Sequence, residues 1–145
     1  MRPRPILEMI FASDLRFTEL AVSACSSILQ TLGFSEEETS DICMALRESV
    51  NNAVVHGNRR SDGKHVMVRF YGILGSITML VRDEGTGFDP ASVPDPTAPE
   101  NLLRPCGRGI FFMRHFMDDV AFRFLRTQGT EVKLMKRARM VAHQS

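Results

Sequence analysis

Glu48 and Asn52 could do chemistry together, because they lie four residues apart in a stretch with a helical pattern. On a helix, residues four apart lie within about 40° of each other on one face. The amide oxygen of an asparagine suits Mg²⁺, and a carboxylate beside it could orient or deprotonate a hydroxyl group or a water molecule. The same spacing also occurs on exposed polar helix faces, where the two side chains only hydrogen-bond to each other.

The hexapeptide DEGTGF at residues 83–88 directly follows an apolar run and is a second candidate. Gly85 and Gly87 permit positive φ angles and let the backbone approach a ligand closely. Asp83, at the end of the predicted strand, could accept a hydrogen bond from an exocyclic amine. A tight turn would use the same residue types.

A third candidate is the GRG sequence in which Gly107 and Gly109 flank Arg108, just before a predicted helix. Free N–H groups at a helix N-terminus bind phosphate, although such glycine pairs are common where a loop meets a helix. Arg104 and Arg108 could reach phosphate groups or the acidic surface of a partner, and they could equally be solvated.

Three further residues have both a functional and a plain structural interpretation. Asn51 could support Asn52 or lie on the surface, and His56 could pack near a ligand or close the helix C-terminus. Thr130, after Gly129, could bond to the region of Asp83 or to a base, but threonine is also an ordinary β-former.

The hydrophobic pattern predicts eight elements that would position these residues. They are a strand at 6–11, a helix from the N-cap Asp14 to about Leu32, a helix from the N-cap Ser35 to about His56, strands at 65–71 and 76–81, a helix at 110–117, and strands at 119–125 and 131–135. This order indicates an α/β fold of the α+β type, a two-layer sandwich of one mostly antiparallel sheet with helices on one face.

Several residues are expected in the core. The first helix would bury a stripe that repeats every four residues, and the second a similar stripe; two cysteines and two phenylalanines should join them. The residues are Leu20, Ala24, Ile28 and Leu32; Ile42, Leu46, Val50, Ala53 and Val54; Cys25 and Cys43; Phe111 and Phe112.

The length of 145 residues predicts a single domain, with a core at about 6–135, a lid at about 89–107 and a basic, frayed tail at 136–145. Five of the seven prolines fall between 89 and 106, so that segment should be an irregular loop. A net charge of +1 gives no general attraction to nucleic acid or anionic lipid. Three scattered cysteines and no apolar run of about 20 residues favour a cytosolic protein without a membrane span.

Taken in order, these motifs resemble those of the GHKL, or Bergerat-fold, ATPases over about residues 6–135. The helix with Glu48 and Asn52 is similar to the N box, and Asp83 begins a segment similar to the first glycine box. The GRG sequence is similar to the second glycine box, and Gly129-Thr130 to the late threonine beside the adenine. Within this superfamily, ALRESVNNAVVHGN at residues 45–58 looks like the helix of the anti-sigma-factor serine kinases, which typically ends in NAxxHG.

The resemblance implies ATP and Mg²⁺ as cofactors. Asp83 would accept from the adenine amino group, Gly85 and Gly87 would pass close to the base and ribose, and Thr130 would lie near the adenine. Asn52 would hold Mg²⁺ and Glu48 would be the general base for a serine hydroxyl. The segment Gly107-Arg108-Gly109 would wrap the phosphates.

The resemblance also implies partners: a sigma factor, and an anti-anti-sigma STAS-domain protein whose serine is phosphorylated. A homodimer is expected, with contributions from residues 6–32, and no direct contact with nucleic acid. Two alternatives stay open, namely a nucleotide-gated binding module or anti-sigma adaptor without catalysis, and a histidine-kinase-like ATPase domain acting in trans. Glu48 favours the kinase, because a pure binding module has no need of a base.

Overall fold

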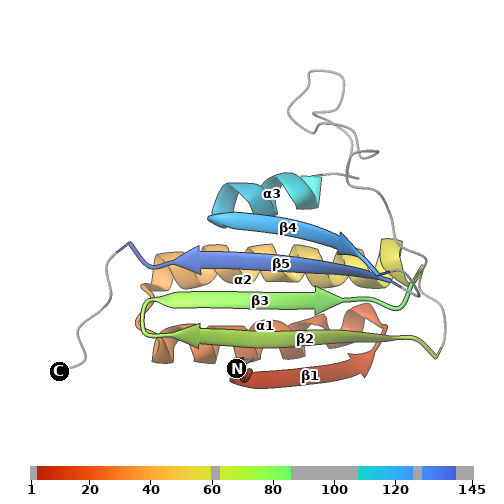
Figure 1. The fold of residues 1–145 in the computed structure, drawn as a ribbon, viewed down its shortest axis with the longest axis horizontal. Coiled ribbons are helices and arrows are strands. Elements are labelled where there is room, and N and C mark those ends of the chain that lie inside the picture. Colours follow the sequence, from red (N-terminus) through yellow and green to blue (C-terminus); the bar gives the residue numbers. More distant parts are fainter. Residues whose placement is uncertain (1–2, 60–62, 86–107, 126–128, 140–145) are drawn as a thin grey trace, which may run out of the picture.

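The structure is a computed structural model and describes residues 3–59, 63–85, 108–125 and 129–139. Its elements follow the predicted order of strands and helices (Figure 1). They are β1 (Leu7–Ala12), a 3₁₀ turn η1 (Leu15–Phe17), α1 (Thr18–Thr31), α2 (Glu36–Asn52), a π-helical turn η2 (Ala53–Gly57), β2 (His65–Ile73), β3 (Ser76–Arg82), α3 (Arg108–Phe116), β4 (Asp119–Phe124) and β5 (Thr130–Arg137).

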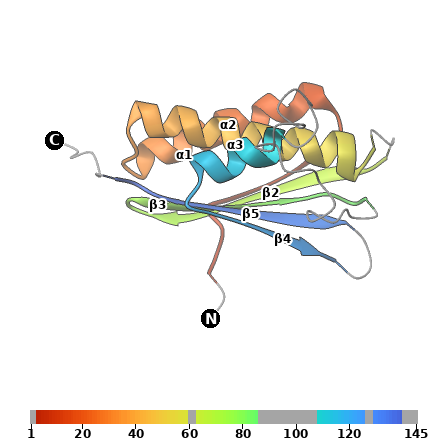
Figure 2. The same cartoon turned by 90° about the horizontal axis from the view of Figure 1, so that it is seen from above.

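The five strands form one antiparallel sheet in the order β1-β2-β3-β5-β4. All three α-helices lie on one face of this sheet (Figure 2). The predicted two-layer α+β sandwich is therefore confirmed. The end of α2 and the end of β3 lie toward the same side of the molecule, on the right in Figure 1.

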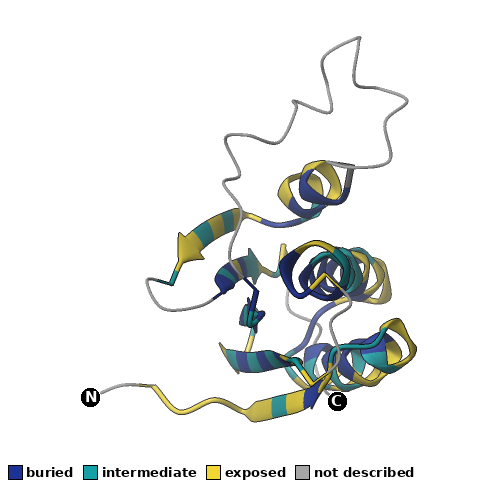
Figure 3. Cartoon of the chain, turned by 90° about the vertical axis from the view of Figure 1, so that its right-hand side faces the viewer, coloured by how far each residue is buried: buried dark blue, intermediate teal, exposed yellow. Residues whose placement is uncertain are grey.

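The core lies between the helices and the inner face of the sheet, as the burial colours show (Figure 3). Alternate residues of the strands point into it, including Val66, Val68 and Phe70 of β2. The predicted stripe of α2 is buried throughout, and Cys25 and Cys43 are buried as expected. The α2 helix begins as predicted, with Ser35 Oγ accepting a hydrogen bond from the N–H of Glu38 at 3.1 Å.

The predicted stripe of α1 was partly wrong, because Leu20 is 53% exposed. The residues of α1 that are buried are Thr18, Ala21, Val22, Cys25 and Leu29, while Ala24, Ile28 and Leu32 pack at the edge of the core. A strict repeat of four drifts by about 40° at each step, so its first member rotates away from the face that the later members share. Asp14 caps the η1 turn and not α1 directly, by accepting from the N–H of Arg16.

The expectation that Phe111 and Phe112 belong to the core was also wrong, since their exposed fractions are 37% and 36%. In α3 the inward positions are taken by Ile110 and, three residues later, Met113; the buried Met117 follows four residues after that, directly beyond the end of the helix. Phe111 and Phe112 lie about 100° and 200° around the helix from Ile110, which places them on the outer side.

Two boundaries differ from the prediction. The α-helical part of α2 ends at Asn52, and a π-helical turn carries the chain on to Gly57. Strand β5 continues through Lys136 and Arg137, which were expected in the frayed tail. The lid expected at 89–107 and the last residues of the tail lie outside the described residues. No described helix is long and apolar enough to cross a membrane.

Candidate active site

Glu48 and Asn52 lie on the last two turns of α2, and both face the start of α3. A Cβ atom added to Gly109 would stand 2.9 Å from Oε2 of Glu48 and 3.1 Å from Nδ2 of Asn52. The backbone of α3 thus passes directly beside both side chains, and Gly109 itself is buried. Both side chains are partly exposed, so a ligand can reach them.

Asp83 follows β3 and is buried, with 4% of its surface exposed. Its Oδ1 atom accepts hydrogen bonds from the N–H of Gly85 at 2.9 Å and from the N–H of Thr130 at 3.1 Å. The N–H of Asp83 in turn donates to the carbonyl oxygen of Thr130 at 3.1 Å. The backbone of Thr130 therefore bonds to Asp83, which is one of the two contacts expected for this residue.

Burial raises the pKa of the Asp83 carboxyl above its ordinary value, because removal from water disfavours the charged form. The two backbone N–H bonds, and more weakly the charge of Lys64, act in the opposite direction. Among the described residues, no cationic side chain hydrogen-bonds to this carboxylate, and a buried carboxylate without such a bond is costly to the fold. Its presence therefore points to a ligand.

Three glycines make room for the Asp83 segment. A Cβ at Gly57 would collide with the Asp83 carboxylate, and a Cβ at Gly129 would collide with the Asp83 carbonyl oxygen. A Cβ at Gly85 would collide with the carbonyl oxygen of Gly57. The end of α2, the end of β3 and the start of β5 thus meet at a spacing that only glycine allows.

Asn58 holds this junction together, although the sequence motifs indicated no role for it. Its side chain is fully buried and bonds to three separate segments. Nδ2 donates to Ser13 Oγ and to the carbonyl oxygen of His65, both at 3.0 Å, and Oδ1 accepts from the N–H of Glu84 at 2.7 Å. The signal in the sequence was its place directly after the helix-ending Gly57.

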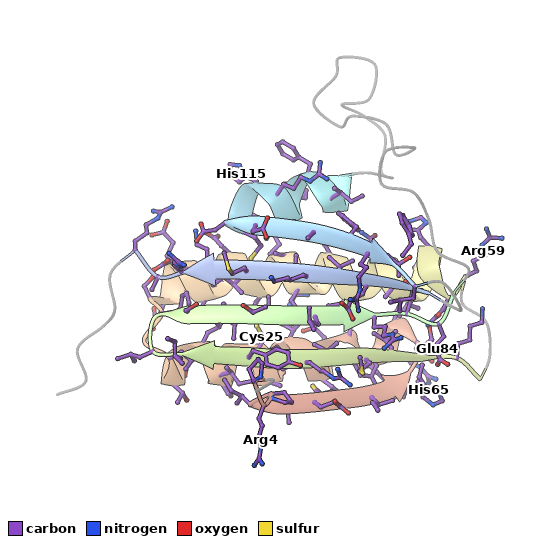
Figure 4. The ribbon with its side chains drawn as sticks, viewed as in Figure 1. Arg4, Cys25, Arg59, His65, Glu84 and His115 are labelled. Carbon is purple, nitrogen blue, oxygen red and sulfur yellow. The ribbon has the colours of Figure 1, made fainter. Side chains whose placement is uncertain are left out.

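Glu84 adds a second tie at the same junction. Its Oε1 accepts from the N–H of His65 at 2.5 Å, and Figure 4 shows the two residues side by side. The segment that carries Asp83 is therefore fixed on both sides, to the end of α2 and to the start of β2.

A small pocket joins the two parts of the candidate site. Asn52 and Asp83 both line it, together with the buried hydroxyl-bearing Ser49. Its apolar walls come from β3, α3 and β5, through Val81, Met113 and Val132. The pocket encloses only about 10 Å³, room for about one water molecule, so it is a small recess of the candidate site and not a cavity for a whole ligand.

The remaining candidate residues divide into two groups. Asn51 does not pair with Asn52; its Oδ1 accepts from Thr18 Oγ1 at 2.8 Å and so ties α2 to α1. His56 is exposed at the end of the π-helical turn. Arg108 begins α3, while Gly87, Arg104 and Gly107 lie outside the described residues.

The donor set fits a magnesium ion that is shared with phosphate oxygens. Mg²⁺ usually keeps several waters and takes only one or two protein ligands in such sites. The described residues contain no group of three or more His, Cys, Asp or Glu side chains that could hold a metal by themselves. The amide oxygen of Asn52, with the Glu48 carboxylate one turn away, matches the sparse type of site.

A family model described as the histidine kinase-like ATPase domain matches residues 11–136. The chain belongs to this family. The histidine kinase-like ATPase match covers every described element from α1 to β4 and nearly all of β5, so it includes the whole candidate site.

Individual relatives within the family are similar over most of their length. An anti-sigma F factor of Pasteuria penetrans is 32% identical over 136 residues, covering 90% of this chain and 89% of the relative. A serine-protein kinase RsbW of Oceanobacillus iheyensis is 27% identical over 120 residues, covering 79% and 76%. These matches support the anti-sigma kinase branch of the family that the residues 45–58 resemble.

Two solved structures share the fold. A crystal structure of the SiaB-SiaC complex from Pseudomonas aeruginosa matches with a TM-score of 0.66 at 14% identity, covering 92% of this chain and 90% of that one. The structure of the RsbU and RsbW domains of a Mycobacterium tuberculosis protein matches with a TM-score of 0.65 at 16% identity. That match covers 97% of this chain and 35% of the longer Mycobacterium tuberculosis chain.

Proposed function

We propose that this chain is an ATP-dependent serine-protein kinase and anti-sigma factor in a bacterial partner-switching system. The observation that carries the proposal is the arrangement of three side chains. Asn52 and Asp83 line one pocket. Glu48 lies one helical turn from Asn52, and both side chains lie against Gly109 of α3. A protein that only binds nucleotide needs the first two residues but has no use for a base.

Each residue has a role in this proposal. The buried carboxylate of Asp83 accepts a hydrogen bond from the adenine amino group, and the apolar residues that line the small pocket contact only the edge of the base. Asn52 holds Mg²⁺ through its amide oxygen. Bound ATP and Mg²⁺ supply the phosphoryl group and neutralise its charge. Glu48 orients the serine hydroxyl of the partner and takes its proton.

The segments around Asp83 and at the start of α3 complete the site. Gly85, Gly87 and Thr130 would border the base, and the segment Gly107-Arg108-Gly109 would offer its N–H groups to the phosphates. Phosphoryl transfer depends mainly on positioning and electrostatic stabilisation, so the rigid junction at Asn58 supports the reaction without touching the substrate.

The relatives named as anti-sigma F factors and serine-protein kinases support the proposed partners. They are a sigma factor and an anti-anti-sigma STAS-domain protein whose serine accepts the phosphoryl group. The chain forms a homodimer in this proposal.

Calorimetric titration with ATP, with and without Mg²⁺, tests the nucleotide site. We expect binding by the wild type that depends on magnesium, and a loss of at least about ten-fold in affinity for Asn52→Ala. The matched control is Asn51→Ala, the same change one residue earlier, where the side chain bonds to Thr18. Equal loss in both variants would contradict the role of Asn52.

Incubation with labelled ATP and the STAS-domain protein encoded nearest in the genome tests the transfer. Phosphoserine survives acid and phosphohistidine does not, so acid-stable label on the partner supports the proposal. Acid-labile label would favour a histidine acceptor. Binding of ATP without any transfer would favour the nucleotide-gated binding module.

A further inference from the structure

Ser49 of α2 carries a buried hydroxyl that has no hydrogen-bond partner in the part of the chain that the structure describes. The residue is 1% exposed. A serine inside a helix can donate to the carbonyl oxygen four residues earlier, but this hydroxyl makes no such bond. A buried polar group without a partner costs the fold free energy, which an alanine at the same place would not.

Ser49 lies where its hydroxyl could bond to a ligand. The residue lines the same pocket as Asn52 and Asp83, among the apolar side chains of Val81 and Met113. The unpartnered hydroxyl therefore belongs to the candidate site and not to the interior of the helical layer.

A second unpartnered hydroxyl belongs to Thr130, the residue whose backbone bonds to Asp83. Thr130 is 1% exposed and its Oγ1 atom also has no partner among the described residues, although its backbone bonds twice to Asp83. Two unsatisfied hydroxyls, from α2 and from β5, thus accompany one buried acid. Thr130 is not among the described residues that line the pocket, whereas Ser49, with its unsatisfied hydroxyl, is. An unsatisfied hydroxyl in an apolar pocket is the pattern expected where a polar group of a ligand completes the hydrogen bond.

The chemistry of adenine indicates which group Ser49 would meet. A carboxylate can only accept, so Asp83 suits the amino group. The ring nitrogens N1 and N7 lie on either side of that amino group, and both are acceptors that need a donor. A hydroxyl supplies one O–H donor.

We propose that Ser49 is a specificity-determining residue, whose hydroxyl donates a hydrogen bond to the N1 or N7 ring nitrogen of the adenine base. The inference rests on the proposed function, because it needs the pocket to bind a nucleotide. It adds to that function a residue that reads the base together with Asp83.

The test compares Ser49→Ala with the wild type for affinity and for stability. We expect Ser49→Ala to bind ATP about five- to ten-fold more weakly, because one hydrogen bond to the base is lost. The same variant without nucleotide should melt about 3–5 °C higher, because the unsatisfied hydroxyl is gone. If the hydroxyl had a purely structural role, Ser49→Ala would lower both the ATP affinity and the melting temperature, or neither of them.

Analogues of ATP locate the bonded atom. In 1-deaza-ATP the N1 nitrogen is replaced by carbon, and in 7-deaza-ATP the N7 nitrogen is. The analogue that lacks the nitrogen bonded by Ser49 should bind to Ser49→Ala as tightly as to the wild type. A matched control is Ser40→Ala, the same change at an exposed position of α2, which should alter neither the affinity nor the melting temperature.

The outcomes separate the two proposals. If the wild type binds ATP and Ser49→Ala binds it equally well, the role of Ser49 is overturned and the nucleotide site stands. An equal loss for ATP and both deaza analogues, or a lower melting temperature of Ser49→Ala, also overturns it. If the wild type binds no nucleotide, both proposals fall together.

Discussion

Gly109, at the start of α3, lies directly against the carboxylate of Glu48 on α2, so that a methyl group there would stand 2.9 Å from Oε2. The nearest obstacle to such a group is therefore the far end of a flexible side chain and not the backbone. The glycine is needed for the space beside Glu48 and Asn52 more than for the packing of the helix. This distinction separates its effect on binding from its effect on stability.

Gly109→Ala should weaken ATP binding by about ten-fold or more, since the new methyl group displaces Glu48 and Asn52 from their places. The free energy of unfolding should change little or rise by up to about 1 kcal/mol, because alanine favours a helix over glycine. Calorimetric titration and urea denaturation measure the two effects. Unchanged ATP binding would contradict the placement of Gly109 in the site.

Gly85→Ala should behave in the opposite way. Its methyl group would collide with the carbonyl oxygen of Gly57, which is backbone and cannot rotate aside. We expect a loss of about 1–3 kcal/mol in the free energy of unfolding, with weaker ATP binding as a consequence. Gly63→Ala is the control, because no described atom lies within 4 Å of a Cβ added there. Its φ of +81° should cost only about 1 kcal/mol in backbone conformation.

Glu48→Gln should lower phosphoryl transfer by about 10²- to 10⁴-fold, since the amide keeps the shape of the side chain but cannot take a proton. Affinity for ATP should change less than about three-fold, because the base acts on the partner's hydroxyl. Transfer of labelled phosphate to the STAS-domain partner measures the first effect. Glu37→Gln, at an exposed position of the same helix, is the control. Parallel loss of binding and transfer would contradict the role of a base.

Asn58→Asp should destabilise the protein by about 2–3 kcal/mol, because Nδ2 donates two hydrogen bonds and the new carboxylate would face two acceptors in a fully buried place. Oδ1 could still accept from Glu84. Where the variant is folded, we expect weaker ATP binding, since Asn58 no longer bonds to Ser13 and β2 and, among the described residues, the Asp83 segment keeps only the Glu84–His65 bond to β2. Asn58→Ser keeps one donor, so its stability and its ATP affinity should both lie between those of the wild type and of Asn58→Asp. Full affinity in a destabilised Asn58→Asp would show that the junction does not position the site.

The fold could be predicted well from the sequence because its hydrophobic pattern is regular. The apolar stripe of α2 follows the helical period. Apolar and polar residues alternate along the strands, and glycines mark several of the turns that follow them. This pattern alone was enough to assign the two-layer sandwich. The pairing of Glu48 with Asn52, and the place of Asp83 after a strand, depended on the same local periods. These features are local, and local spacing is what a sequence displays directly.

Features that depend on tertiary packing could not be predicted in this way. The outward position of Phe111 is set by which side of α3 meets α2, and an aromatic residue alone does not reveal this. The bonds of Asn58 reach as far as Ser13, which is 45 residues away along the chain. The unpartnered hydroxyl of Ser49 was also invisible, because a serine inside a helix gives no sign of whether its oxygen finds a partner.

Asp83→Asn should change both nucleotide selectivity and the pH dependence of stability. The amide presents a donor to the adenine amino group, so affinity for ATP should fall about ten-fold or more, while affinity for GTP, which lacks that amino group, should fall much less. Calorimetric titration with the two nucleotides measures this ratio. If both affinities fall alike, Asp83 has only a structural role.

The pH dependence follows from the raised pKa of Asp83. Between its ordinary value of 3.8 and the higher value in the folded protein, the native state binds more protons than the unfolded state. Stability contributed by this group therefore falls as the pH rises through that interval. Relative to Asp83→Asn, which does not titrate, the wild type should lose free energy of unfolding from acidic toward neutral pH. Asp119→Asn, at an exposed position of β4, controls for the loss of one charge. A difference between wild type and Asp83→Asn that is constant with pH would show that burial does not penalise the charged carboxylate.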